Sequence, residues 1–537
     1  MKRLITHRNF ELREWQQEAF RSVLSVCNNG KKDFLCVATP GAGKTKFALK
    51  TAHHFLEKNL CDRIVVVTPS EGLKRQWAYE AANFAGIDLD PDFTNNQGME
   101  ASDFHGVVIT YALLGQDKKQ IHSQNTFAKR TFVIFDEVHH AGESLSWGDA
   151  LKRSFEDAVF RLAISGTAFR SDDAPIPFIK YNNNVSVADY NYSYERAIRE
   201  NVCRPVYFTI HDGTMKWRVG TQEFEHNFKD YLTPDQVSKR LKTALDPKGN
   251  WVRDVLKDAD EKLNEIRRTH HNAAALVFAA TQRHAKEISK VLLELTGEEP
   301  PVVVSDDGDG SEKIESFKRS NSRWLVSVRM VSEGVDIPRL RVGVYLTIIK
   351  AELYFRQAVG RFVRVITGLH HQDAYIFIPQ DKDIVKLAET IQIERDHALD
   401  EAERLKNAGA GGNTDLFGND YTPALQGKFI PLGSEATDSK TIAVNIEINS
   451  GIKHSVDTRK VPVNDDPVYL QKERLRDNLN LLAKRIALKR KNGNPGIKPD
   501  WKIAHKIWRE QGGKEMHLET IEELINRLNF YQNLLRN

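Results

Sequence analysis

The stretch Phe34-Leu-Cys-Val-Ala-Thr-Pro-Gly-Ala-Gly-Lys-Thr45 decides the fold of the first part of this chain. It opens with a short apolar run that predicts a buried strand, and it continues into a glycine-rich turn. Apolar residues at helical spacing follow, so the turn would lie at a helix N-terminus, where the helix dipole favours anions. Strand, glycine-rich turn and helix in this order are typical of a loop that binds phosphate groups. A glycine-rich turn without such a role is the alternative, which the flanking strand and helix disfavour.

The glycines and the two polar residues at the end of this loop have distinct expected roles. Gly41 and Gly43 allow backbone angles and a close approach that a side chain would block, so the loop N–H groups can point at phosphate oxygens. Lys44 would place its charge on the outer phosphates, and the Thr45 hydroxyl would bind Mg²⁺. The loop therefore predicts ATP and Mg²⁺ as cofactors. The nucleotide-binding residues expected here are Thr39, Gly41, Ala42, Gly43, Lys44 and Thr45.

A pair of acidic residues in the string Asp136-Glu-Val-His139 follows the apolar run over residues 131–135. The run predicts a buried parallel strand, and open parallel sheets bind their ligands at the carboxyl ends of the strands. Asp136 would hold Mg²⁺ directly or through water, and Glu137 would orient and polarise an attacking water molecule. The alternative is a strand-terminal turn with two solvated acids. The upstream phosphate loop makes the catalytic interpretation the stronger one.

A third string, Gln357-Ala-Val-Gly-Arg-Phe-Val-Arg364, places two arginines three residues apart in a distant part of the chain. Planar guanidinium groups suit phosphate oxygens better than a lysine ammonium does. Arg361 and Arg364 could therefore reach the γ-phosphate of a nucleotide held by the phosphate loop. Two arginines at this spacing could also form a solvated helix face, but the surrounding glutamine and glycine frame argues against that interpretation.

Taken in this order, the strings resemble the motifs of superfamily 2 helicases and translocases of the DExH-box type. The resemblance runs from Leu12 to Pro379 and is strongest to the branch of restriction-type and repair-type DNA helicases. The matching stretches are residues 12–16, 66–70, 108–111, 136–139, 165–170, 275–279, 331–338 and 357–364.

The resemblance implies roles for further residues around the nucleotide. Gln16 would read the adenine edge, and Asp336 would contact the nucleotide from the second lobe. Arg361 and Arg364 would act as arginine fingers, with Gln357 beside them as a catalytic residue. The nucleic-acid strand would be contacted through its backbone, without sequence preference, by Thr68, Thr110, Arg170 and Ser332.

The resemblance also implies an α/β fold class with two tandem RecA-like parallel-sheet lobes, a linker and a small α-helical C-terminal module. The alternation of strand and helix patterns along the chain agrees with two such lobes. We expect a first lobe over 1–204, an inter-lobe connection or insert over 205–270, a second lobe over 271–406, a partly disordered linker over 407–466 and a basic helical module over 467–537.

The C-terminal module differs in composition from the rest of the chain. Between Lys472 and Arg509 there are twelve Lys or Arg residues against three Asp or Glu. Leucine and isoleucine at helical spacing predict a small three-helix bundle with one basic surface. That surface could bind a phosphate backbone independently of sequence. A solvated basic face, or a docking site for a protein partner, remains the alternative.

Composition places outer limits on these interpretations. The 537 residues predict three or four domains, and a net charge of only +4 does not by itself indicate a polyanion partner. Four cysteines without metal-ligand spacing predict a reducing compartment. No apolar run approaches membrane-spanning length, so we expect no membrane partner and a cytoplasmic protein.

The sequence therefore predicts an ATP-hydrolysing helicase or translocase, with DNA favoured over RNA as its track. One alternative is an RNA helicase, because both kinds of motor share these motifs. Another is an ATP-driven switch that senses nucleic acid and recruits an effector protein without unwinding.

Overall fold

The computed structural model describes all residues except 1–10, 143–144, 168, 170–174, 220, 305–309, 329–336, 370, 409–439, 442–465, 494–501 and 537. Contacts between residues divide the chain into two units. The first comprises Met1–Ala38, Gly43–Asn191 and Ile452–Asn537, and the second comprises Thr39–Ala42 and Tyr192–Gly451. Each unit is described separately below.

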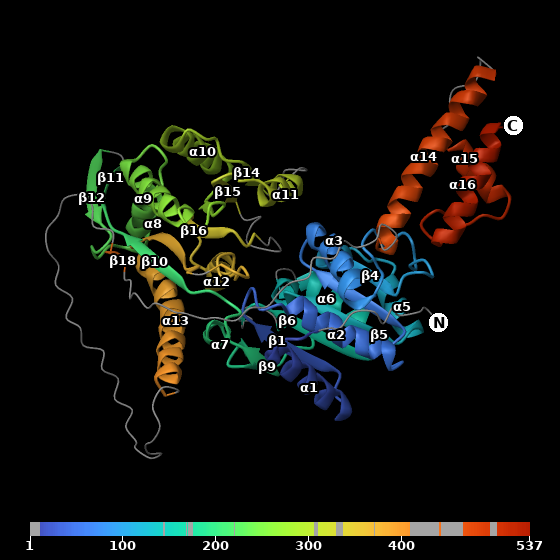
Figure 1. Cartoon of the computed structure of the whole chain (residues 1–537), viewed down its shortest axis with the longest axis horizontal. Helices are drawn as coiled ribbons and strands as arrows, with labels where there is room; N and C mark the ends of the chain where they lie inside the picture. Colours follow the sequence, from blue (N-terminus) through green and yellow to red (C-terminus); the bar gives the residue numbers. More distant parts are fainter. Residues whose placement is uncertain are drawn as a thin grey trace. The chain divides into compact units, whose positions relative to one another are not determined.

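The first unit is built on a sheet in the order β3-β4-β2-β5-β6-β1-β9 (Figure 1). Strands β1 to β6 run parallel wherever they pair, and their continuous apolar runs are buried on both faces, as a helix-covered parallel sheet requires. The strands are β1 (Asp33–Ala38), β2 (Arg63–Thr68), β3 (Leu89–Asp90), β4 (Gly106–Thr110), β5 (Thr131–Asp136), β6 (Phe160–Ser165) and β9 (Tyr190–Tyr192), with a separate hairpin of β7 (Tyr181–Asn182) and β8 (Val185–Ser186).

Helices between these strands cover the sheet. Helix α2 packs on β5 and β6, whereas α3 packs on β2 and β4. The helices are α1 (Glu14–Asn28), α2 (Lys44–Glu57), α3 (Glu71–Glu80), α4 (Tyr111–Gly115), α5 (Ile121–Ala128) and α6 (Leu145–Phe155), with single turns η1 (Ala81–Ala85) and η2 (Val138–Gly142).

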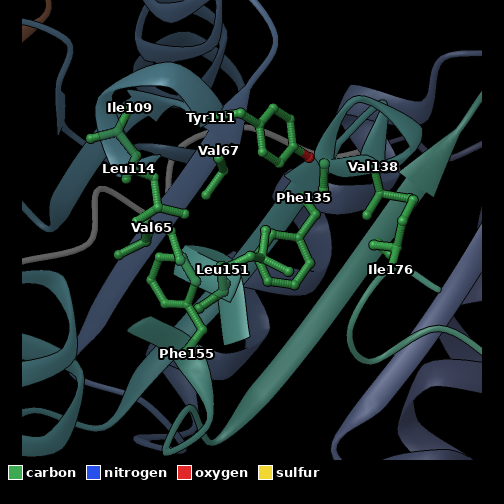
Figure 2. Packing of buried hydrophobic residues seen from close by; sticks show 14 of the residues in the cluster. Val65, Val67, Ile109, Tyr111, Leu114, Phe135, Val138, Leu151, Phe155 and Ile176 are labelled. Carbon is green, nitrogen blue, oxygen red and sulfur yellow. The ribbon is translucent and has the colours of Figure 1, made fainter. Parts of the chain in front are cut away.

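A core of aliphatic and aromatic side chains lies between the strands and α4 and α6 (Figure 2). Tyr111 is fully buried in this core, with its ring beside Phe135 at the end of β5. Its hydroxyl oxygen lies at the edge of the apolar cluster, directed towards the turn that follows β5. The core therefore reaches up to the carboxyl edge of the sheet, where Asp136 lies.

The second unit is built on another largely parallel sheet, in the order β14-β15-β13-β16-β17-β10-β18. Its strands are β10 (Val206–His211), β13 (Ala274–Ala279), β14 (Val302–Val304), β15 (Trp324–Val328), β16 (Leu340–Leu346), β17 (Ala374–Pro379) and the antiparallel β18 (Lys440–Thr441), with a hairpin of β11 (Thr214–Val219) and β12 (Gln222–Asn227). Its helices are α7 (Tyr194–Arg199), α8 (Pro234–Ala244), α9 (Asn250–Arg267), α10 (Gln282–Thr296), α11 (Gly310–Arg319), α12 (Glu352–Val359) and α13 (Lys382–Ala408).

The prediction of a separate connection or insert over 205–270 is wrong for much of that range. Strand β10 pairs in parallel with β17 along its whole length, so it belongs to the second sheet. Helix α9 packs on β16, and α13 lies along β10 (Figure 1). Only the β11–β12 hairpin forms a small sheet of its own within this range. The second lobe therefore begins at about Tyr192 rather than at residue 271.

Three helices form the C-terminal module, as the leucine and isoleucine spacing predicts. They are α14 (Val468–Gly493), α15 (Ile503–Glu510) and α16 (Ile521–Arg536). Their apolar core contains Leu479, Ala483, Ile486, Ala504, Leu524 and Tyr531. Together with the two parallel-sheet lobes, these helices confirm the predicted fold class.

One cation of the basic surface predicted for this module forms a buried ion pair with another part of the first unit. The Lys472 ammonium is buried 2.5 Å from a carboxylate oxygen of Asp103, whose other oxygen accepts from the Ile521 N–H at 3.1 Å. Lys484 and Arg485 remain exposed on α14. The helix therefore divides its cations between an intramolecular anchor and the surface. In the described part of the chain, no helix combines the length and apolar character needed to cross a bilayer.

Candidate active site

The phosphate loop lies between β1 and α2, as predicted. Gly41 and Gly43 have positive φ angles of 86° and 95°, a left-handed region that disfavours any side chain. Lys44 begins α2, and its ammonium lies 3.2 Å from the Ala38 carbonyl oxygen and 3.4 Å from a Glu137 carboxylate oxygen. The end of β1 and the acidic pair at the end of β5 thus meet at the lysine.

Gln16 lies against the loop and not at an open surface. Its amide oxygen accepts from the Arg13 N–H at 2.9 Å, and its amide nitrogen donates to the Gly43 carbonyl at 2.8 Å. A β-carbon at Gly43 would lie 3.0 Å from this nitrogen, so the glycine also makes room for the glutamine. The structure shows Gln16 supporting the backbone of the loop, and its contact with adenine stays a prediction.

Asp136 ends β5 and is held by two donors from neighbouring segments. The Trp77 indole N–H, on α3, donates to its carboxylate at 2.7 Å. The Tyr111 hydroxyl, at the start of α4, donates to its main-chain carbonyl at 3.0 Å. Sequence analysis missed both residues. The spacing of the apolar Leu73, Trp77 and Ala78 is a signal that could have placed the tryptophan on a buried helix face, but its partner depends on β2 lying next to β5.

Glu137 has a left-handed backbone with φ of 44°, which is rare outside glycine and asparagine. Its carboxylate accepts from the Gly166 N–H at 3.0 Å, at the end of β6. The Ser165 hydroxyl lies 3.4 Å from this carboxylate and donates to the Thr167 carbonyl at 2.9 Å. The ring nitrogen Nδ1 of His139 lies 3.6 Å away. Groups that follow two neighbouring parallel strands, β5 and β6, thus fix the direction of this carboxylate.

The two carboxylates have opposite electrostatic environments. Burial raises the pKa of Asp136, and the adjacent charge of Glu137 raises it further, against the effects of the Trp77 hydrogen bond and Lys44. Burial also acts to raise the pKa of Glu137, but Lys44 and then His139 and the Gly166 N–H outweigh it and lower that pKa. Carboxylates whose pKa values are driven apart in this way are suited to different chemical roles.

The donors at this edge fit Mg²⁺. A carboxylate and a threonine hydroxyl are oxygen ligands of the kind this ion prefers, and a bound cation would offset the unfavourable charge of Asp136. Among the described residues, no group of three or more His, Cys, Asp or Glu forms a separate metal site. In proteins, Mg²⁺ is usually bound by one or two carboxylates together with substrate phosphates. The residues that would hold it are Asp136 and Thr45.

The two threonines predicted to contact nucleic acid are buried in this structure. The Thr68 hydroxyl donates to the Ser70 carbonyl at 3.2 Å and lies 3.4 Å from the Ile109 carbonyl, whereas Thr110 caps α4 by accepting from the Leu113 N–H. Ser70, at the N-terminus of α3, is exposed. The contacts predicted for Arg170 and Ser332, and the nucleotide contact of Asp336, lie outside the described residues.

The arginine string lies in the second unit, at the end of α12. Gln357 is buried on this helix, and Arg361 and Arg364 follow it in a partly exposed turn. The turn is fixed by a residue that sequence analysis did not single out. The buried Arg204 guanidinium donates to the carbonyl oxygens of Phe362 at 2.5 Å, Pro338 at 2.9 Å and Leu340 at 2.6 Å.

Two further contacts hold the same turn. The Arg204 N–H donates to the Val363 carbonyl at 2.9 Å. The Phe362 ring packs closely on Gly343, where a β-carbon would lie only 2.7 Å from the ring. Burial, followed by the charge of Arg341, lowers the pKa of Arg204 to about 9, so the guanidinium still carries its proton at neutral pH. Arg204 therefore connects the turn over residues 361–364, called the arginine turn below, to the Pro338 and Leu340 carbonyls at the start of β16.

The comparisons with known proteins agree with this arrangement. The family described as type III restriction enzyme, res subunit, matches residues 9–170, and the helicase conserved C-terminal domain matches residues 258–366. The uncharacterised Rv2917 protein of Mycobacterium tuberculosis is 41% identical over 402 residues, which make up 74% of this chain and 66% of that protein. The chain thus spans slightly less than two thirds of that relative.

A more distant relative is named as a DNA translocase. The DNA 3'-5' translocase XPB2 of Sulfurisphaera tokodaii is 27% identical over 384 residues, covering 66% of this chain and 79% of that protein. Among solved structures, a fragment assigned as the HsdR subunit of a type I restriction enzyme from Vibrio vulnificus has the same fold. It superposes with a TM-score of 0.50 at 16% identity, over 70% of this chain and 65% of that one. From its motifs, its two parallel-sheet lobes and these matches, the chain belongs to the superfamily 2 helicases, in the branch of restriction-type and repair-type motors.

Proposed function

We propose that this protein hydrolyses ATP to move along or unwind nucleic acid, with DNA as its track. The observation that carries the proposal is the meeting of Lys44, Asp136 and Glu137 at one edge of the first sheet. A lysine ammonium lies 3.4 Å from a directed carboxylate, next to a second carboxylate that is buried. This constellation follows a loop with two left-handed glycines, which suits a triphosphate.

The residues in and around the phosphate loop would then have defined tasks. The loop from Thr39 to Thr45 would enclose the phosphates, with Lys44 on the outer ones and Gln16 at the adenine. Asp136 and Thr45 would hold Mg²⁺, which neutralises phosphate charge when it is bound. Glu137 would accept a hydrogen bond from the attacking water. The Gly166 N–H and the Lys44 ammonium hold its carboxylate in one direction, and its lowered pKa keeps it ionised for that role.

The second unit would supply cations at the γ-phosphate. Arg361 and Arg364 would stabilise the charge that develops during phosphoryl transfer, with Gln357 beside them and Asp336 as a further nucleotide contact. The clamp made by Arg204 supports this role, because a catalytic cation must be held in place before the reaction.

Two findings favour DNA as the track. The archaeal relative is named a DNA translocase, and the family matched by residues 9–170 takes its name from restriction enzymes. Backbone contacts through the segments of Thr68, Thr110, Arg170 and Ser332 would carry no sequence information, so movement would not depend on sequence. The exposed cations of α14 would add salt-dependent affinity, unless they serve a protein partner.

The decisive experiment is the ATPase rate of the wild type and of Glu137→Gln at one salt concentration. It is measured without polymer and with single-stranded DNA, duplex DNA or RNA. We expect stimulation by DNA and a loss of at least about 100-fold in the variant, because the general base is removed. Glu57→Gln, an exposed acid at the end of α2, is the matched control and should behave like the wild type.

Other outcomes would redirect the proposal. Stimulation by RNA alone would identify an RNA helicase. A rate that no polymer changes, but that Glu137→Gln still abolishes, would indicate a nucleotide-driven switch. An unchanged rate in Glu137→Gln would overturn the assignment of the catalytic pair.

A further inference from the structure

Asp136 is the meeting point of the two segments that carry predicted nucleic-acid contacts. The segment of Thr68 continues from β2 through the exposed Ser70 into α3, and α3 carries Trp77. The segment of Thr110 continues directly into Tyr111. One segment thus holds the Asp136 carboxylate, and the other holds its carbonyl oxygen.

We propose that Trp77 and Tyr111 are positioning residues through which nucleic acid bound at these two segments sets the placement of Asp136. The inference rests on the proposed function, because it assumes that nucleic acid binds at these segments. It adds a route by which binding changes the nucleotide site, made of two named hydrogen bonds.

The geometry makes the tryptophan contact specific. The indole N–H has only one hydrogen to donate, and it meets the Asp136 carboxylate at 2.7 Å within the short range typical of bonds to a charged acceptor. Trp77 is 2% exposed, so no water would readily replace this donor. A rotation or shift of α3 would therefore move or release one oxygen of the carboxylate.

The tyrosine contact acts on the backbone of the same residue. Tyr111 is fully buried, and its hydroxyl donates to the carbonyl of the last residue of β5. Because the adjacent Glu137 has a left-handed backbone, this carbonyl lies at a turn whose direction sets both carboxylates. A shift of α4 would therefore alter the turn that carries both acids.

The two segments are also joined to each other. The Thr68 hydroxyl lies 3.4 Å from the Ile109 carbonyl, and β2 pairs in parallel with β4 up to Thr68 and Thr110. Thr110 in turn caps the helix that Tyr111 begins. A ligand on either segment is thus connected to both donors, and the pair is expected to respond as one unit.

The test compares Trp77→Phe and Tyr111→Phe with the wild type. Each substitution keeps an aromatic ring in the core and removes the donor. Two controls lie elsewhere in the same unit: Trp508→Phe removes an indole N–H that donates to the Glu519 carboxylate at 2.7 Å, and Tyr181→Phe removes a hydroxyl that accepts from the Ile176 N–H at 3.1 Å. The first readout is the ratio of DNA-stimulated to basal turnover, which we expect to fall roughly tenfold in Trp77→Phe and less in Tyr111→Phe.

The second readout is binding without turnover. Coupling between two sites is reciprocal, so a nucleotide analogue with Mg²⁺ that changes DNA affinity in the wild type should change it less in the variants. Fluorescence anisotropy of labelled DNA, with and without the analogue, measures this factor. A double variant should lose little more than Trp77→Phe alone, because both donors act on one residue.

The outcomes separate the two proposals. If no polymer stimulates the wild type and the analogue leaves DNA affinity unchanged, the motor function fails and this inference falls with it. If the wild type is stimulated but both variants keep its ratio and its coupling factor, the inference alone is wrong. Equal losses of basal and stimulated turnover, with a lowered melting temperature, would show a merely structural role and would also overturn it.

Discussion

The carboxylate turn of the first unit and the arginine turn of the second are held in different ways. Side-chain donors hold Asp136, and they sit on the helices α3 and α4, which follow the strand ends that carry other predicted contacts. The arginine turn is held through its main chain, by one buried guanidinium that bonds to three carbonyl oxygens. The first arrangement lets the site respond to neighbouring segments. The second fixes the path of the chain whatever side chains the turn carries, provided that Arg204 is present.

The largest expected effect is that of Arg204→Met. The variant would leave three carbonyl oxygens without this donor, including the buried ones of Phe362 and Leu340, and we expect the second unit to lose about 3–5 kcal/mol in free energy of unfolding. Arg204→Lys should recover only part of this loss, because an ammonium cannot bond to three acceptors in the guanidinium plane. Urea denaturation measures the change.

The exposed Arg283, which pairs with Glu287, provides the control, and Arg283→Met should leave the transition unchanged. A small effect of Arg204→Met would show that other contacts hold the arginine turn. The contrast between the two turns would then lose its basis.

A second prediction uses low pH to distinguish an ion pair, which titrates, from hydrogen bonds to main-chain carbonyls, which do not. In the first unit the buried Arg63 pairs with Glu100 at 3.0 Å, whereas Arg204 bonds only to groups that do not titrate. Burial acts to raise the pKa of Glu100, but Arg63 and then Lys129 lower it to about 2. The pair therefore stabilises the folded state fully above about pH 4.5, the pKa of Glu100 in the unfolded chain. As the pH falls towards 2, about 3 kcal/mol of the free energy of unfolding is lost.

Chemical denaturation of the wild type and of Glu100→Gln between pH 6 and pH 3 would measure this loss. The variant should show a flatter pH dependence in the transition of the first unit. A slope that is unchanged by the substitution would contradict the assignment to this pair.

The smallest expected effect is that of Gly343→Ala. Its β-carbon would lie 2.7 Å from the Phe362 ring, so the ring or the strand must move. Overpacking of this kind costs about 1–3 kcal/mol. The smaller side chain in Phe362→Leu should relieve part of the clash in the double variant, as a double-mutant cycle would show. Additive losses of stability in the double variant would mean that the added methyl group does not clash with the Phe362 ring.

The parts of the site that sequence alone could predict are those whose chemistry is local. The apolar runs before Thr39 and Asp136 predicted two strands, and the glycine spacing predicted the loop that follows the first of them. The supports could not be predicted, because each depends on strand order. Trp77 reaches Asp136 only because β2 lies beside β5, and Arg204 reaches Phe362 across more than 150 positions of sequence.

The misplaced start of the second lobe has the same origin. Residues 206–211 are apolar enough to form a strand, but nothing local shows that their partner is β17, which begins at Ala374. The mixed, charged sequence that follows them, including residues 239–248 and 261–268, led to the interpretation as an insert. Periodicity predicts that a strand exists, whereas its place in a sheet depends on residues far along the chain.

The left-handed backbone of Glu137 has an evolutionary consequence. Holding a glutamate there costs on the order of 1 kcal/mol, which glycine or asparagine would avoid. Selection for folding alone would therefore remove the acid, whereas under the proposed function selection for hydrolysis would retain it. A descendant of this chain that needed to bind nucleotide without cleaving it would be expected to replace Glu137 early and to become more stable as it did so. Glycine or asparagine at this position would then mark a lineage that had given up catalysis.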